Sequence, residues 1–191
     1  MNINISEVAN LPSRFGNFNV QSFKEGQKEH LVISAKELSD APIVRVHSEC
    51  LTGDAIGSLK CDCRDQLEYG LKMANETGGM VIYLRQEGRD IGLLNKINAY
   101  ALQDKGFNTV EANHQLGFAA DERTYEIVTF ILNHYNIKKI KLLTNNPDKI
   151  NSISDIEIIE RVPIVMESNI HNENYLDVKR DEMGHMLPKD R

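Results

Sequence analysis

The 191-residue sequence predicts an α/β fold, a single layered domain with a mixed sheet flanked by helices. Apolar and polar residues alternate in the N-terminal quarter of the chain, as is typical of strands. Further along, short apolar runs alternate with segments whose apolar residues recur at helical spacing. Strands that alternate with helices form parallel pairs, so we expect parallel strands in the later part of the chain. We expect the N-terminal strands to add an antiparallel portion to the same sheet.

The N-terminal part contains three runs that we expect to be strands. Polar segments with the sequences EGQKE and ELSDA separate them. The three runs are FNVQSF at 18–23, HLVISA at 30–35 and PIVRVH at 42–47. A helix should follow, because Leu67, Leu71 and Ala74 share one helical face, and Gly78 is expected to end it.

The middle of the chain predicts a strand, a polar loop and a second helix. MVIYL at 80–84 is a short apolar strand, and RQEGRDIG after it has the composition of a loop. In the second helix, Leu94, Ile97 and Ala101 lie on one face, and Gly106 is expected to close it.

The C-terminal third predicts a third helix and two more strands. The helix carries a strong apolar stripe and ends near Asn136; its apolar residues are Ile127, Val128, Ile131, Leu132 and Tyr135. Strands are expected at 139–143 and 156–165, with TNNPDK between them turning into a short helix. The tail is a weaker helical segment that we expect to be flexible from about residue 170.

Composition excludes several classes of protein. The sequence has no run of about 18 apolar residues, and MNINISEVAN lacks the basic and apolar regions of a signal peptide, so we expect a cytoplasmic protein. The net charge of −6 argues against broad binding to nucleic acid or membrane. In the cytosol, three cysteines favour a metal or catalytic site over disulfides.

All three cysteines lie in one polar segment, as Cys50, Cys61 and Cys63. Thiolates suit zinc, and a C-x-C pair can reach one ion if the chain turns there, with Gly53 and Gly57 supplying flexibility. Three thiolates plus water would leave an open, catalytic position. The alternatives are that His47 completes a closed structural site, or that the cysteines are buried small hydrophobic residues.

Five segments resemble the GTP cyclohydrolase II family when they are taken together and in order. They are RVHSECLTGD (45–54), SLKCDCRDQL (58–67), RQEGRDIGLLNKINAYALQDKG (85–106), TVEANHQLGFAADER (109–123) and LLTNNPDKI (142–150). The resemblance extends from about Leu11 to the closing NENYLDVKRDEMGHML. It implies the monofunctional form, without an added dihydroxybutanone phosphate synthase domain, and a homodimer.

The resemblance implies hydrolysis of GTP in the first step of riboflavin biosynthesis. The imidazole ring opens, C8 leaves as formate, pyrophosphate is released, and a 2,5-diamino-6-ribosylamino-pyrimidinone 5′-phosphate remains. The resemblance assigns one zinc ion per subunit to the three cysteines, which suits a reaction that needs an activated water. Mg²⁺ is expected on the nucleotide phosphates.

A triphosphate would have to be held without a P-loop, since G-x-x-x-x-G-K-[ST] is absent. Arginines can make forked phosphate contacts, and an ordinary capped helix explains the TNNPDK turn as well as an anion site does. The resemblance implies GTP binding by Arg45, Val46, His47, Ser48, Glu49, Gln66, Glu87, Gly88, Arg89, Thr109, Thr144 and Lys149. Gln66 and Glu87 are our candidates for reading guanine.

Three further residues are implied in the chemistry. By resemblance, Asp121 accepts a proton, Arg123 attacks or clamps the α-phosphate, and Tyr100 takes part in ring opening. From the residues alone, Asp121 could equally be the N-cap of the following helix, and Tyr100 a core aromatic residue.

Two rival interpretations differ in chemistry. A related enzyme would open the ring but retain the formyl group, and a zinc-stabilised nucleotide-binding module would turn nothing over. Products formed from GTP distinguish all three.

Overall fold

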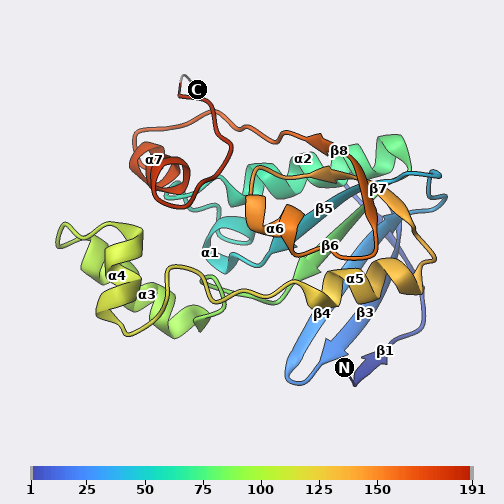
Figure 1. Cartoon of the computed structure of the whole chain (residues 1–191), viewed down its shortest axis with the longest axis horizontal. Coiled ribbons are helices and arrows are strands. Elements are labelled where there is room, and N and C mark those ends of the chain that lie inside the picture. Colours follow the sequence, from blue (N-terminus) through green and yellow to red (C-terminus); the bar gives the residue numbers. More distant parts are fainter. Residues whose placement is uncertain (1, 190–191) are drawn as a thin grey trace.

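The computed structural model describes residues 2–189, and within them the chain forms an eight-stranded mixed sheet flanked by helices (Figure 1). The predicted fold class is confirmed. The N-terminal strands are antiparallel: β1 (Ile3–Ile5) and β2 (Ala9–Ser13) pair with β3 (Gly16–Glu25), which pairs with β4 (Lys28–Ala35). β4 then pairs antiparallel with β6 (Met80–Leu84).

The second half of the sheet is parallel. β5 (Ile43–Ser48) lies between β6 and β7 (Lys139–Leu143), and β8 (Glu157–Val162) follows at the edge. The predicted strands at 80–84 and 139–143 have the observed bounds. The first is a short apolar run, and in the second lysines alternate with aliphatic residues.

The two faces of the sheet carry different residues because side chains alternate along each strand. Val44 and Val46 of β5 pack in the main apolar core with α5 (Glu126–His134). Arg45, between them, faces α2 (Cys63–Thr77), where Gly70 leaves room for it: a Cβ on Gly70 would lie 3.1 Å from Arg45 Cγ.

The helix α2 has the apolar face and the C-terminal end that its sequence predicts. Leu67, Leu71 and Ala74 pack against Phe18, Ile33 and Val81 of the sheet. Gly78 ends the helix in the left-handed conformation, with φ of 68°. A Cβ there would lie 2.9 Å from the carbonyl oxygen of Glu37, so glycine is required at this position.

Other helices surround one edge of the sheet. α1 (Leu51–Asp54) follows β5, α3 (Gly92–Gln103) packs on α4 (Thr109–Gln115), and α6 (Pro147–Asn151) follows β7. α7 (Glu173–Asp181) lies in the predicted helical tail. The pair α3 and α4 projects from the sheet, and α7 lies beside it (Figure 1).

One predicted helical face is wrong. Leu94 is 77% exposed and Ile97 46% exposed, whereas Lys96 and Ala99 of the same helix are buried. The periodicity correctly predicted a helix, but α3 turns its charged residue inward because Lys96 has partners there. The sequence also gave no prediction of β1, β2, α1 or α4 as elements, and β8 is shorter than expected.

Within the described residues, no helix is both long and apolar enough to cross a membrane.

Candidate active site

The carboxyl ends of three parallel strands bring the motif segments together. β5 runs into the segment that holds Cys50, β6 into the loop 85–91, and β7 into Thr144. Because parallel strands end at the same edge of a sheet, segments far apart in the sequence meet around one cavity.

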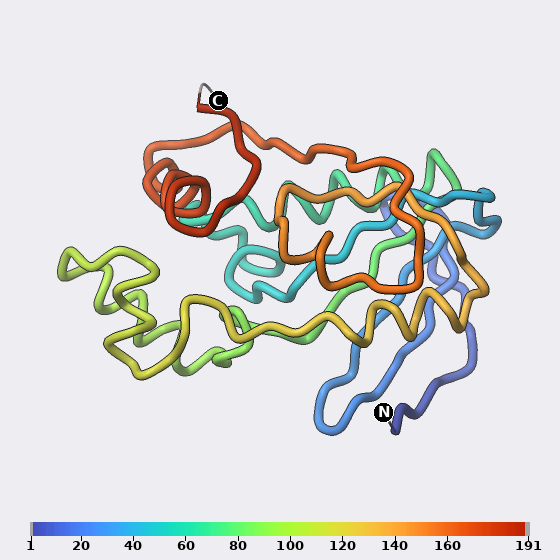
Figure 2. The backbone as a smooth tube through the Cα atoms, in the orientation of Figure 1, coloured from blue at the N-terminus to red at the C-terminus, as the bar shows by residue number. Residues whose placement is uncertain are grey.

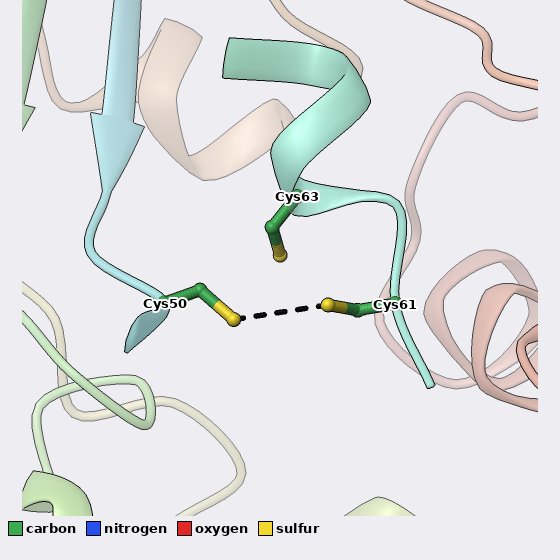
Figure 3. A group of neighbouring side chains, drawn as sticks. All are labelled: Cys50, Cys61 and Cys63. Carbon is green, nitrogen blue, oxygen red and sulfur yellow. Dashed lines mark hydrogen bonds between the residues drawn. The ribbon is translucent and has the colours of Figure 1, made fainter. Parts of the chain in front are cut away.

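The three cysteines form a compact sulfur cluster (Figure 3). Cys50 follows β5, Cys63 is the first residue of α2, and the three side chains point toward one another. The Sγ atoms lie within 4.8 Å of one another, and Cys50 and Cys61 are 3.7 Å apart. Tetrahedral zinc with bonds of about 2.3 Å needs sulfurs about 3.8 Å apart, so the cluster fits zinc.

Gly53 lets the sulfur atoms approach one another. A Cβ on this residue would lie 2.8 Å from Cys61 Sγ and 3.0 Å from Cys50 Sγ. We expected flexibility from Gly53, but its contribution is the absence of a side chain.

A buried ion pair lies beside the sulfur cluster. Lys96 Nζ donates to Cys50 Sγ at 3.1 Å and to Glu87 Oε1 at 2.7 Å. Glu87 Oε2 accepts the backbone N–H of Leu51 at 2.6 Å. Hydrogen bonds from the other two thiols, followed by the Lys96 ammonium, lower the pKa of Cys50 far below its ordinary value, which favours the thiolate that a metal needs.

His47 has a different partner from the one that a closed metal site requires. Its Nε2 lies 3.1 Å from Asp54 Oδ1, and its ring stacks on Tyr83. Asp54 also accepts from the hydroxyl of Tyr83 and from the backbone N–H of Cys50. Within residues 2–189, the metal-binding group consists of the three cysteines, so the Cys₃His alternative has no geometric support.

Four cations also line the cavity: Arg45 and Lys149 are buried, and Arg89 and Arg123 are half-buried. Arg45 donates to Gln66 Oε1 at 2.5 Å, and burial lowers its pKa to about 10. Lys149 Nζ donates to the carbonyl oxygen of Val46 at 2.7 Å. Burial, then the charges of Arg45 and Arg123, lower the pKa of Lys149 well below its ordinary value. Such a cluster is stabilised by an anion.

Asp121 and Arg123 form a two-point ion pair in the loop before α5. Arg123 Nε donates to Asp121 Oδ1 at 2.8 Å, and Nη2 donates to Oδ2 at 2.5 Å. Burial alone would lower the pKa of Arg123, but Asp121 raises it above its ordinary value. α5 begins at Glu126 with Tyr125 as N-cap, so the alternative of Asp121 as N-cap is wrong.

Tyr100 reaches the sulfur cluster from α3. Its hydroxyl lies 3.3 Å from Thr52 Oγ1, which in turn lies 3.8 Å from Cys50 Sγ. Burial raises the pKa of Tyr100 to about 12, so the hydroxyl keeps its proton near neutral pH.

Most of the predicted site residues line this cavity. They are Arg45, His47, Ser48, Glu49, Cys50, Cys61, Cys63, Gln66, Gly88, Arg89, Tyr100, Thr109, Arg123, Thr144 and Lys149. Three lie behind the lining. Val46 faces the core on the other side of β5, Glu87 lies under the Cys50 loop, and Asp121 holds Arg123 from behind. The α6 turn is capped by Asn146, whose Oδ1 accepts from Asp148, as in an ordinary helix.

Sequence reasoning missed several residues of this cavity. Lys96 lies in the segment 85–106 that resembles the family. The spacing of the apolar residues in this helix predicted that Lys96 would face solvent, whereas it is buried. Tyr175, Lys179 and His185 also line the cavity, from the tail that was expected to be flexible. The sequence of this tail predicted a helical segment but not what the helix packs against.

The fold and the cavity define an α/β protein in which three cysteines that could hold a metal ion and a group of cations face one cavity at the carboxyl edge of the sheet. Residues 4–163 match the family described as GTP cyclohydrolase II. The chain belongs to this family.

The similar proteins span nearly the whole chain. The GTP cyclohydrolase-2 of Campylobacter hominis is 65% identical over 98% of this chain and 97% of its own length. That of Campylobacter fetus subsp. fetus is also 65% identical, with the same coverage of both chains. A solved two-domain 3,4-dihydroxy-2-butanone 4-phosphate synthase from A. baumannii shares 16% identity, with a TM-score of 0.45. The alignment covers 86% of this chain and 40% of that chain, too weak a likeness to carry an argument.

Proposed function

We propose that this protein hydrolyses GTP to formate, pyrophosphate and 2,5-diamino-6-ribosylamino-4(3H)-pyrimidinone 5′-phosphate, the first step of riboflavin biosynthesis. The observation that carries the proposal is the three-thiol cluster and the cation cluster facing one cavity in a member of the GTP cyclohydrolase II family. In the proposed reaction, water attacks a ring carbon and pyrophosphate is released. One substrate must therefore reach both a metal that activates water and cations that bind phosphate.

The cation cluster is the proposed triphosphate site. Arg45, Arg89, Arg123 and Lys149 supply charge, and Thr144 supplies a hydroxyl beside them. Two of these cations are held by backbone oxygens, with Arg45 Nη1 3.1 Å from the carbonyl of Leu143. Their positions are therefore set before the substrate arrives, which lowers the cost of binding. Mg²⁺ would enter with the phosphates and keep mostly water ligands.

Cys50, Cys61 and Cys63 would hold zinc. When bound, zinc supplies Lewis acidity and activates water near neutral pH. Lys96 offsets the negative charge of the three thiolates through its contact with Cys50, and Glu87 fixes Lys96. Tyr100, whose hydroxyl lies 3.3 Å from Thr52 Oγ1 in this loop, would hydrogen-bond the reacting ring.

Arg123 would stabilise charge at the α-phosphate. Its guanidinium also donates to Ser48 Oγ at 3.3 Å, which orients it toward the end of β5. Asp121, the implied proton acceptor, has both oxygens engaged by Arg123. It can accept a proton once Arg123 turns toward phosphate and releases at least one of these oxygens.

Guanine recognition is proposed for Gln66, with Glu87 in an indirect role. Both Glu87 oxygens bind protein groups, so it would act by holding the Cys50 loop that borders the base. Gln66 lines the cavity, where its Oε1 accepts from Arg45 and its Nε2 donates to Asp62. An amide has a second N–H and a second lone pair, and these would read the base.

We further propose a cytosolic homodimer. Three free thiols stay reduced in the cytosol, which supports the proposed location.

The proposed homodimer is supported by exposed apolar residues on α3 and on the loop beside it, where Leu94 and Ile56 are 77% and 73% exposed. Lys60 of that loop lies 3.0 Å from Asp104 at the end of α3. Sedimentation of the purified chain at micromolar concentration tests the dimer.

Product analysis tests the function. Purified zinc-loaded protein with GTP and Mg²⁺ should release formate and pyrophosphate in equal amounts and form the pyrimidine product. Formation of the pyrimidine without formate would assign the chain to the formyl-retaining chemistry. Binding of GTP without any product would make it a nucleotide-binding module.

A further inference from the structure

The chain beyond residue 163, where the family match ends, returns to the cavity. Tyr175 and Lys179 of α7, and His185 after it, line the cavity together with the cation cluster. The C-terminal segment lies beside the start of α2 (Figure 2). The Lys179–Asp62 contact joins the same two segments. All three lie in the closing segment of the chain, to which the resemblance extends but in which it implies no site residue.

This segment is docked by specific contacts. Leu176 is buried, and the backbone N–H of Met186 donates to the carbonyl oxygen of Asn145 at 2.9 Å. Asn108 Nδ2, at the start of α4, donates to Glu182 Oε1 at 3.2 Å. α7 is therefore fixed to both the α6 turn and α4, and its side chains have defined positions over the cavity.

The ammonium group of Lys179 is largely buried, but its ion pair with Asp62 is long. Its side chain is 14% exposed, and its Nζ lies 3.5 Å from Asp62 Oδ1, at the limit of a hydrogen bond. The other oxygen of Asp62 accepts from Gln66 at 2.5 Å. Nζ also lies 4.5 Å from the centre of the Tyr175 ring. An ammonium has three donors, so one long ion pair leaves capacity for another acceptor.

Other hydrogen-bond donors around the cavity also lack an acceptor that an anion could supply. Arg89 Nη2 and Asn146 Nδ2 are buried donors without a hydrogen-bond partner in the described residues, and both residues line the cavity. His185 lies within reach of the same charges: burial, then Lys179, Arg123, Lys149 and Arg89, lower its pKa to about 3. Lys179 is thus part of the cation cluster, although it comes from a different end of the chain.

We propose that α7 supplies Lys179 as a further binding residue for the phosphates of the substrate. In the complex, a phosphate oxygen replaces the long contact with Asp62 as the main partner of Lys179, and Tyr175 keeps the lysine stem over the cavity. The identity of this anion as a nucleotide triphosphate rests on the proposed function; the anion site itself rests on the unmet donors and the clustered cations.

Binding of inorganic triphosphate to the zinc-loaded protein, measured by calorimetry, tests this assignment without requiring turnover. Lys179→Gln keeps the stem over Tyr175 and removes the charge. It should weaken triphosphate binding by about 10- to 100-fold, the value of one hydrogen bond to a charged group. Lys179→Arg should restore part of the loss. Arg180→Ala is the matched control, because Arg180 carries the same charge on the same helix but pairs with Asp177 and Asp181.

Two further measurements separate binding from support of the fold. Zinc content should stay unchanged in Lys179→Gln, and amide exchange in α7 should match the unaltered protein. Equal loss in Lys179→Gln and Arg180→Ala, or loss of zinc through release of Asp62, would overturn the assignment. So would triphosphate affinity that does not change in Lys179→Gln. If the protein binds triphosphate as expected but does not consume GTP, the proposed reaction fails while the anion site stands.

Discussion

The half-buried ion pair of Arg123 and Asp121 would hold a charge ready for the proposed reaction. The carboxylate of Asp121 holds the guanidinium of Arg123 by two hydrogen bonds and keeps it protonated. Such a pair is stable without substrate, yet a phosphate can compete for the same donors because it also offers paired oxygens. The sequence placed the two residues two apart, but only the fold shows that they bind each other rather than cap a helix.

Replacement of Arg123 should affect pyrophosphate release most. Arg123→Ala removes the charge proposed to stabilise the α-phosphate, and we expect this step to slow by on the order of 10³-fold. Arg123→Lys should recover only part of the rate because the forked geometry is lost. Single-turnover release of pyrophosphate measures this step. A near-normal rate in Arg123→Ala would exclude the residue from the reaction.

Lys149 predicts an uptake of protons when an anion binds. Burial and two neighbouring arginines lower its pKa in the free protein. A bound triphosphate would raise this pKa again, so at a pH between the two values binding must take up a proton. At mildly alkaline pH the phosphate and histidine groups contribute little, since their pKa values lie near 6 to 6.5.

Calorimetry in buffers of different ionisation enthalpy measures this uptake. Lys149→Arg is the control, because arginine stays protonated in both states. The same proton uptake in Lys149→Arg as in the unaltered protein would show that another group is responsible.

At the scale of elements, prediction from the sequence succeeded where local pattern and tertiary partner agree. β6 is an apolar run and largely buried, and in β7 the lysines alternate with the buried residues Ile140 and Leu142. α3 is the counterexample. Its apolar stripe faces outward and Lys96 faces inward, because Cys50 and Glu87 lie 46 and nine residues away in sequence but adjacent in space. No periodicity can reveal such a partner.

The site was predicted in the same uneven way. The cysteines were recognisable because their residue type and spacing have few other uses in a cytosolic protein. Lys179 was not, because a lysine in an amphipathic tail is most often solvated and its partner Asp62 is distant in sequence.

Replacement of two glycines, one in α1 and one in α2, should weaken zinc binding and triphosphate binding separately. Gly53→Ala in α1 would place a Cβ 2.8 Å from Cys61 Sγ, so zinc should bind more weakly while the core persists. Gly70→Ala in α2 would press on Arg45 Cγ at 3.1 Å, so triphosphate should bind more weakly with zinc retained. Zinc content and triphosphate affinity of both variants measure the two effects. Identical defects would mean that the sulfur and cation clusters do not act independently.

At the scale of the whole molecule, the sulfur cluster and the cation cluster are separate structures that share one cavity. The thiols belong to segments that leave β5 and enter α2, whereas Lys149 and Thr144 belong to the end of β7 and α6. The main apolar core lies on the other face of the sheet, with α5. Loss of the metal should therefore leave both the fold and the cation cluster in place.

Cys61→Ala tests this separation. The change leaves two thiolates, so zinc occupancy should fall sharply. Formate formation should be lost, because in the proposed reaction the hydrolytic steps at C8 depend on the metal. The cations proposed to bind the triphosphate keep their own partners, so GTP should still bind and some pyrophosphate should still be released. Zinc content, circular dichroism and both products are measured on one preparation.

The outcome also distinguishes catalytic from structural zinc. If the metal held the fold together, its binding free energy would be part of the folding free energy, and Cys61→Ala would unfold. The hydrogen bond of His47 to Asp54 argues against that, since it leaves the cluster with three protein ligands in the described residues. A folded variant that lacks zinc yet forms formate at the unaltered rate would exclude catalytic zinc. An unfolded variant would instead make the metal a structural element of the α1–α2 region.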